Sequence, residues 1–372
     1  MTHEKDTTSP PLISHPALDL AGDVALLTAA LMDIESVSGN EGVLADAVED
    51  ALRALPHLEV TRNGDSIVAR TALGRSERVI LAGHLDTVPL PTTPGSRGTV
   101  PSTWAGNVLY GRGATDMKGG VAVQLAIAAT LPEPTKDITF IFYDHEEVAA
   151  VKSGLGRLVR ENRELLDADF GILLEPTNGT VEGGCNGTIR FEGTTRGLAA
   201  HSARAWMGDN AIHAAAPILA RLAAYEPATV TVDGLDYRES LNAVKVHGGT
   251  AGNVIPDQCV VEINYRFAPD KSPAQAEAHV RELLEGFELV CTDSSAGARP
   301  GLNAPAAASF VTAVGRDPLP KYGWTDVARL SEMGIPAVNF GPGDALLAHS
   351  DNEHVAAQDI RDCLAALTRW LG

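Results

Sequence analysis

The chain has 372 residues, enough for about two domains, and its 44% hydrophobic and 21% charged residues are typical of a globular protein and exclude wholesale disorder. Its 29 basic and 48 acidic residues give a net charge of −19, which disfavours nucleic acid or anionic lipid as a partner. No apolar stretch approaches the roughly 18 to 20 residues of a membrane span, and the first residues lack the basic and apolar regions of a signal peptide. We therefore expect a cytoplasmic protein without a membrane partner.

The four cysteines lie far apart and form no C-x-x-C pair, so we expect reduced thiols rather than a thiolate metal site or a disulfide framework. They are Cys185, Cys259, Cys291 and Cys363.

The first half of the chain alternates between helical and extended patterns. Apolar residues at helical spacing predict helices over 23–35, 43–55, 118–131 and 155–162. Short apolar or alternating runs predict strands over 58–62, 66–71, 78–82, 137–143 and 169–174. Residues 89–107 are rich in Gly, Pro, Ser and Thr and are expected to be loop. This alternation favours an α/β sheet covered on both faces.

The pattern changes after Cys185. The predicted order is strand 188–195, helix 210–225, strands 241–248 and 258–267, helix 273–286 and strand 287–292. That β-α-β-β-α-β order is the ferredoxin-like arrangement. Helices over 306–314, 325–333 and 355–371 and a strand over 336–340 then resume the first pattern. We therefore predict a larger α/β domain over 1–186 and 295–372, with a small α+β domain inserted over 187–294.

Five segments place acidic or imidazole side chains just beyond apolar strands or at a helix start. They are Gly83–Asp86, Thr115–Gly120, Asp144–Glu147, Leu174–Thr177 and Ala348–Asp351. Ligands of open α/β sheets bind at the carboxyl ends of the strands. A mixed set of imidazoles and carboxylates without sulfur matches Zn²⁺, or a similar ion such as Co²⁺ or Mn²⁺, in a hydrolytic site.

Charge balance favours two ions rather than one. With His84 and His349 neutral and Asp116, Glu147 and Glu175 ionised, the predicted ligands carry three negative charges. Two divalent ions and a bridging hydroxide balance that charge, whereas one ion leaves the site negative. Asp116 is predicted to bridge the ions, with His84 and Glu175 on one and Glu147 and His349 on the other.

Two further carboxylates have separate predicted roles. Asp86, two residues after His84, is expected to accept the other imidazole N–H and fix the tautomer. Glu146 is expected to be the general base that deprotonates the bridging water and the acid that then protonates the leaving nitrogen. His145 and His354 are rival ligands that rank lower, because each lies beside a better-placed candidate.

These residues resemble the M20 family of dinuclear zinc amidohydrolases and peptidases. The resemblance lies in Gly83–Pro89, Gly111–Gly120, the Glu146–Glu147 pair, Leu174–Thr177 and His349, and extends over nearly the whole chain. It implies a mixed-sheet, zinc-aminopeptidase-like catalytic domain, two zinc ions, and an inserted ferredoxin-like domain that acts as a lid and dimerisation module. A homodimer is therefore expected from the resemblance alone.

Within the family, Gly183–Thr188, Ala200–His213 and Asn264–Pro269 are most similar to the actinobacterial succinyl-diaminopimelate desuccinylases. The resemblance implies hydrolysis of N-succinyl-LL-2,6-diaminopimelate, an anionic small molecule, for lysine and cell-wall synthesis. It also implies that His201 reaches the partner subunit's site and polarises the scissile carbonyl. Asn253 and Arg266 would bind substrate carboxylates. Thr325, which with Asp326 resembles a Gly-x-Thr-Asp loop of the family, would also bind substrate.

One departure concerns the substrate. The proteobacterial desuccinylases carry Arg-Arg-Gly-Ser where this chain has Cys185–Thr188, so the arginine for the acyl carboxylate has to come from elsewhere, and Arg190 and Arg204 are the candidates.

N-acetylornithine deacetylase, another aminoacylase or a dipeptidase remains the alternative activity. A non-catalytic metal- or ligand-binding protein is the alternative of another class. A nucleotide-binding enzyme is disfavoured, because Asp116 follows Gly111-Arg-Gly113 where a dinucleotide fingerprint needs glycine.

Overall fold

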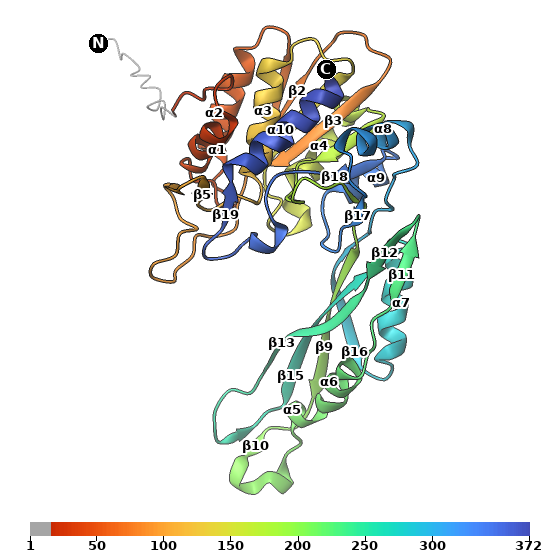
Figure 1. The fold of residues 1–372 in the computed structure, drawn as a ribbon. Helices are drawn as coiled ribbons and strands as arrows, with labels where there is room; N and C mark the ends of the chain where they lie inside the picture. Colours follow the sequence, from red (N-terminus) through yellow and green to blue (C-terminus); the bar gives the residue numbers. More distant parts are fainter. Residues whose placement is uncertain (1–15) are drawn as a thin grey trace, which may run out of the picture. The chain divides into compact units, whose positions relative to one another are not determined.

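A computed structural model describes residues 16–372, so the opening residues with their expected lack of a signal peptide lie outside the described part. The chain divides into two compact units (Figure 1). The first runs through Asp169 and takes in Leu174–Gly179 and Phe340–Gly372. The second comprises Phe170–Leu173 and Thr180–Asn339.

The first unit contains four sheet strands in the order β1-β2-β6-β3. They are β1 (Glu59–Asn63), β2 (Ser66–Arg70), β3 (Arg78–His84) and β6 (Asp137–Tyr143). The β1/β2 and β2/β6 pairs are antiparallel and the β3/β6 pair is parallel, so the sheet is mixed. All seven residues of β6 are buried, which means that both faces of this strand are covered, as its continuous apolar sequence predicts.

Helices cover this sheet. They are α1 (Val24–Met32), α2 (Gly42–Arg53), α3 (Lys118–Thr130), α4 (Gly154–Glu161) and α10 (Ala357–Leu371), with 3-10 turns η1 (Ala150–Lys152), η2 (Arg163–Leu166) and η4 (Ala345–Leu347). Helix α3 contacts α1, α10 and β3 and is buried along nearly its whole length, because its sequence is apolar on every side (Figure 1). Helix α2 instead buries one stripe, which includes Leu44, Val48 and Leu52, against β1 and β2.

A small antiparallel sheet, ordered β19-β5-β4, completes the first unit. Its strands are β4 (Thr103–Ala105), β5 (Val108–Tyr110) and β19 (His354–Ala356). The sequence analysis predicted loop over 89–107 and a helix from 355, so β4 and the start of β19 correct those two predictions. Strands of three residues are too short to display an alternating pattern.

The second unit begins with strands in the order β7-β18-β8-β17. They are β7 (Phe170–Leu173), β8 (Glu182–Gly183), β17 (Leu319–Pro320) and β18 (Ala337–Asn339). The β18/β7 and β17/β8 pairs are parallel and the β18/β8 pair is antiparallel. Two helices, α8 (Pro305–Val314) and α9 (Val327–Glu332), belong to this part.

A separate four-stranded antiparallel sheet in the second unit has the order β13-β15-β9-β16 (Figure 1). Its strands are β9 (Gly187–Arg196), β13 (Ser240–Gly248), β15 (Gln258–Phe267) and β16 (Glu288–Ser295). Helices α5 (Ala211–Ala214), α6 (Ala216–Ala223) and α7 (Pro273–Leu283) pack on it. Buried and exposed residues alternate along most of β9, so the helices cover one face and the other remains open. The β-α-β-β-α-β order is the predicted ferredoxin-like one.

Short elements connect the strands and helices of the second unit. They are β10 (Ala200–His201), η3 (Ser202–Met207), β14 (Val254–Ile255) and a hairpin of β11 (Thr229–Val232) and β12 (Leu235–Arg238). The helix predicted over 210–225 is divided into α5 and α6. The fold class is confirmed, whereas the domain bounds 187 and 294 stay a prediction.

Two expectations from composition can be compared with the described residues. Over 16–372, no helix has both the length and the apolar composition that crossing a membrane requires. All four cysteines are free, and three of them are buried, which agrees with the expected reduced thiols.

Candidate metal centre and substrate residues

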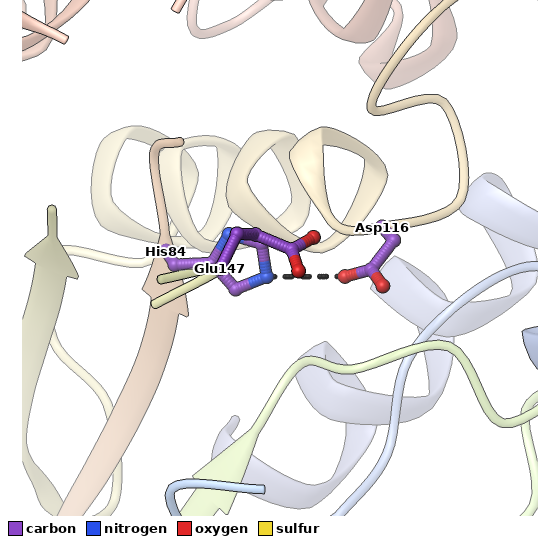
Figure 2. A group of neighbouring side chains, drawn as sticks. All are labelled: His84, Asp116 and Glu147. Atoms are coloured by element: carbon purple, nitrogen blue, oxygen red, sulfur yellow. Dashed lines mark hydrogen bonds and ion pairs between the residues drawn. The ribbon is translucent and has the colours of Figure 1, made fainter. Parts of the chain in front are cut away.

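His84 is the last residue of β3, and its ring is almost fully buried with 1% exposure. Its Nε2 lies 3.0 Å from Oδ1 of Asp116, which stands two residues before α3 (Figure 2). Its Nδ1 lies 2.9 Å from the backbone carbonyl oxygen of Asp86. The imidazole is therefore held on both sides, with Nε2 directed at a carboxylate.

Glu147 joins His84 and Asp116 in one group (Figure 2). Each of the three side chains offers one nitrogen or oxygen atom, and these atoms all lie within 4.8 Å of one another. The residues come from the end of β3, the start of α3 and the loop after β6, so the predicted strand ends do bring them together. Such a set of one imidazole and two carboxylates fits a divalent cation.

His349 lies against the same group. Its Nε2 is 2.9 Å from Oε1 of Glu147 and 3.3 Å from Oδ2 of Asp116. Its backbone has φ 63°, in the left-handed region that residues other than glycine rarely adopt, so surrounding contacts must hold it there.

The pKa values of the group reflect dense negative charge. Burial would lower the pKa of His84, but the hydrogen bond and charge of Asp116 outweigh it and hold that pKa well above its usual value. Hydrogen bonds to Asp116 and Glu147 raise the pKa of His349 to about 10. Burial would raise the pKa of Asp116, yet hydrogen bonds from the two imidazoles hold it below its usual value. A divalent cation would balance this charge as well as protons do, so the residues suit a metal centre.

Glu175, the fifth predicted ligand, is buried with 5% exposure. The N–H of the preceding Leu174 donates to the carbonyl of Ala82 at 2.9 Å, which sets this segment beside the end of β3. The backbone here is tightly enclosed, because a Cβ at Gly120 or Gly341 would overlap the carbonyl oxygen of Leu174. The backbone at positions 120 and 341 can therefore lie this close to the segment of Glu175 only because both residues are glycine.

Asp86 has a different set of partners from the predicted one. Its carboxylate accepts the backbone N–H of Glu146 at 2.9 Å, the N–H of Glu147 at 3.0 Å and the hydroxyl of Ser38 at 2.6 Å. The nearest carboxylate oxygen is 3.5 Å from Nδ1 of His84, while the carbonyl of Asp86 is closer. The carboxylate mainly holds the loop that carries the glutamate pair, and its predicted role in fixing the imidazole stays a prediction.

The side chains of the rival histidines make other contacts. Nδ1 of His145 lies 2.8 Å from Oδ2 of Asp144, and Nδ1 of His354 lies 2.7 Å from the carbonyl of Asn352 while its ring stacks on Tyr110. Glu146 lies close enough to His84 for its charge to contribute to the raised imidazole pKa. The lower rank of the two rival histidines as ligands stays a prediction.

His201 and Asn253 are brought together in the second unit. Residues 200–201 pair with 254–255 as β10 and β14, and the N–H of Ser202 donates to the carbonyl of Asn253 at 2.9 Å. Nδ1 of the exposed His201 accepts the N–H of Ala203 at 3.0 Å. Since Nδ1 is an acceptor, the neutral ring carries its proton on Nε2, where it is available as a donor.

Arg266 and Arg190 lie on neighbouring strands, on the open face of the four-stranded sheet. Arg190 is opposite Asn264 on β15, two residues from Arg266 and therefore on the same face. Burial lowers the pKa of the Arg266 guanidinium, and the nearby charge of Arg190 lowers it further. Nε of Arg266 donates to Oδ1 of Asn264 at 3.1 Å. Two cations are thus close together on this face.

Thr325 is buried, and its hydroxyl donates to Oδ1 of Asn339 at 2.8 Å. Asp326 pairs with Arg329 through a short contact one helical turn on. A substrate contact by Thr325 stays a prediction.

A buried ion pair beside the metal group was not predicted from the sequence. Oε2 of Glu353 lies 2.8 Å from Nη1 of Arg112, and Oε1 accepts the N–H groups of Thr115 and Asp116 at 3.1 Å. Arg112 is four residues from Asp116, and Glu353 is four residues from His349. This spacing is the signal in the sequence that could have pointed to the pair.

Comparison with known proteins identifies the relatives of this chain. Residues 80–372 match Peptidase family M20/M25/M40. A protein of Corynebacterium glutamicum named succinyl-diaminopimelate desuccinylase is 46% identical over 367 residues, covering 96% of this chain and 98% of the relative. A protein of Mycobacterium tuberculosis, provisionally named for the same activity, is 52% identical over 358 residues, covering 95% and 99%.

Solved structures share the fold. An M20 family metallo-carboxypeptidase from Sulfolobus solfataricus superposes with a TM-score of 0.76 at 16% identity, covering 94% of this chain and 98% of that one. The YXEP protein of Bacillus subtilis, described as a dinuclear metal-binding peptidase, has a TM-score of 0.70 at 18% identity, covering 93% and 96%. The family match spans well over half of the sequence and the relatives cover nearly all of it, so this chain belongs to Peptidase family M20/M25/M40.

Proposed function

We propose that this chain is a metal-dependent amide hydrolase that cleaves N-succinyl-LL-2,6-diaminopimelate to succinate and LL-2,6-diaminopimelate. The observation that carries the proposal is 46% identity to the Corynebacterium glutamicum desuccinylase over 98% of that protein, in a chain whose family residues converge on one imidazole and carboxylate group. Such a reaction would serve lysine and cell-wall synthesis in the cytoplasm. The four free cysteines are compatible with that compartment.

Five side chains would hold two divalent ions, for which we propose Zn²⁺, with Co²⁺ or Mn²⁺ as the alternatives. They are His84, Asp116, Glu147, Glu175 and His349, with Asp116 shared between the ions. When bound, the ions supply positive charge that acidifies a water molecule and polarises the scissile carbonyl.

Glu146 would move the protons. It lies in the loop after β6, where the carboxylate of Asp86 accepts the backbone N–H groups of Glu146 and Glu147, so the backbone that carries its side chain is fixed. We infer that its carboxylate takes a proton from the attacking water and gives it to the leaving nitrogen. His201 would donate its Nε2–H to the carbonyl oxygen as negative charge develops there, which is the tautomer that its bond from Ala203 favours.

Two arginines would bind the carboxylates of the substrate, with Asn253 as a further donor. Arg266 and Arg190 present two cations on one open sheet face, whereas Arg204 lies in the exposed turn η3. We therefore favour Arg190 over Arg204 for the succinyl carboxylate, since a forked donor beside a second cation suits a dicarboxylate.

The activity is tested with zinc-loaded protein on N-succinyl-LL-2,6-diaminopimelate, with N-acetylornithine, a dipeptide and a chelated sample in parallel. Fast, chelator-sensitive hydrolysis of the succinyl compound is expected. Preference for the acetyl compound or the dipeptide would overturn the substrate, and stoichiometric metal without any turnover would favour a binding protein. Glu146→Gln should retain metal and lose about 10²- to 10⁴-fold in kcat.

The acyl specificity is tested by a pair of variants. Arg190→Met should raise KM for the succinyl substrate by about 10- to 100-fold, the loss of one charged hydrogen bond, and leave hydrolysis of an acetyl substrate unchanged. Arg204→Met should change neither. The opposite result would assign the succinyl carboxylate to Arg204.

We further propose a homodimer formed through the edge strand β13. From Asn242 to Gly248 every residue of β13 is exposed, and Val244 and Val246 are 60% and 47% exposed. An edge strand that carries exposed apolar side chains favours pairing with a second copy. Sedimentation should give a dimer that Val246→Lys weakens, and a wild-type monomer would contradict this proposal.

A further inference from the structure

The Glu353–Arg112 ion pair contacts the backbone at Asp116, a predicted ligand of the candidate metal centre. The side chain of Glu353 has no exposed surface and that of Arg112 is 4% exposed. Both oxygens of Glu353 are used, one by Arg112 and the other by the N–H groups of Thr115 and Asp116. Removing two charges from water is costly, so a buried pair with this many partners suggests a role beyond stability.

The same pair reaches the segment that carries His349. Nη1 of Arg112 donates to the carbonyl of Ser350 at 3.2 Å, and the N–H of Gly111 donates to the carbonyl of Glu353 at 3.1 Å. Residues 111–116 and 350–354 are thereby tied together at both ends. The first segment ends at the predicted ligand Asp116. The second begins directly after the predicted ligand His349.

His349 needs such support because its left-handed backbone is unfavourable for a residue with a side chain. Asp116 needs it because its carboxylate is predicted to be shared between two ions, which demands a fixed position. Metal affinity depends on groups that orient the ligands as well as on the ligands themselves.

We propose that Glu353 and Arg112 are positioning residues that hold Asp116 and His349 in place for metal binding. This inference rests on the proposed metal-dependent function. Glu353 acts on the backbone N–H groups at Asp116, and Arg112 transmits the same constraint to the loop of His349. Neither side chain is expected to touch substrate.

Glu353→Gln is the main test, because it keeps the size of the side chain and removes the charge. The Zn²⁺ dissociation constant should rise about 10- to 100-fold, the usual effect of losing a partner that orients a metal ligand. The visible absorption of the Co²⁺-loaded protein should also change, since that spectrum reports ligand geometry. Glu353→Asp should recover part of both properties, and KM should change less than kcat.

Glu239→Gln is the matched control. The Glu239 carboxylate is also buried, pairs with Lys271 at 2.8 Å and accepts the N–H of Ala268 at 2.8 Å, but it lies in the second unit. It should lower stability without changing Zn²⁺ affinity or the Co²⁺ spectrum.

A Glu353→Gln protein that is destabilised like the control yet binds Zn²⁺ with wild-type affinity and spectrum would overturn the proposal. If Glu353→Gln does not fold, Arg112→Lys provides the same comparison, because it keeps the charge and loses the forked donor. Wild-type protein that binds no metal would overturn the proposed function itself, so the two failures are distinguishable.

Discussion

The three hydrogen bonds to Asp86 allow a quantitative prediction about the loop that carries Glu146 and Glu147. In Asp86→Asn one oxygen becomes an NH₂ group, so one of the two backbone N–H groups at 146 and 147 faces a donor instead of an acceptor. The hydroxyl of Ser38 can rotate and accept, so its bond is largely kept. A hydrogen bond to a charged group contributes about 1.5–3 kcal/mol, and the variant should lose roughly one such bond.

Amide hydrogen exchange of a peptide covering 144–147 measures this loss directly, because local opening determines its exchange. A loss of about 1.5–3 kcal/mol corresponds to roughly 10- to 150-fold faster exchange. Ser38→Ala is the control, since it leaves both N–H bonds to Asp86 in place and should accelerate exchange far less. Equal exchange in Asp86→Asn and the wild type would refute the reasoning that this carboxylate fixes the loop.

Two further predictions concern the start of α3. Burial lowers the pKa of the Lys118 amine from 10.5 to about 7, and the amine donates to two carbonyls at the end of α1. Between these pKa values the unfolded chain binds a proton that the folded chain lacks, so stability should rise with pH by up to about 1.4 kcal/mol per unit. The free energy of unfolding is measured with urea at pH 7 to 10 in the presence of a chelator. Its rise with pH should be smaller in Lys118→Met than in the wild type, and an equal rise would contradict the lowered pKa of Lys118. Gly120→Ala should destabilise by about 1–3 kcal/mol through overlap with Leu174, whereas Gly323→Ala, where a Cβ meets nothing within 4 Å, should stay within about 0.5 kcal/mol.

The strands that end in predicted ligands were found from sequence because their apolar runs are continuous. The runs at 78–82 and 137–143 correspond to β3 and β6, which are buried on both faces, and such strands do not need an alternating pattern to be recognised. The β11–β12 hairpin was missed, although Asp233-Gly234 between its strands is a typical two-residue turn signal and both residues have positive φ.

The side chains that form the site could be predicted from the sequence, whereas the contacts that these side chains make with backbone groups could not. His84, Asp116 and Glu147 converge as predicted. Asp86 and Glu353 each also accept two backbone N–H groups, and the sequence does not show where these point. The functions of both carboxylates therefore became visible only with the fold.

The hydrogen bond between Thr115 and Glu353 joins positions 238 residues apart, and the whole second unit is made from the chain between them. A ribosome adding 5–20 residues per second needs roughly 10–50 s to synthesise that interval. Once residue 147 has been added, the nascent chain carries His84, Asp116 and Glu147, while the segment that anchors Asp116 does not yet exist. Folding of the metal centre is thus necessarily a late event in synthesis, and it depends on the return of the chain after the second unit has been made.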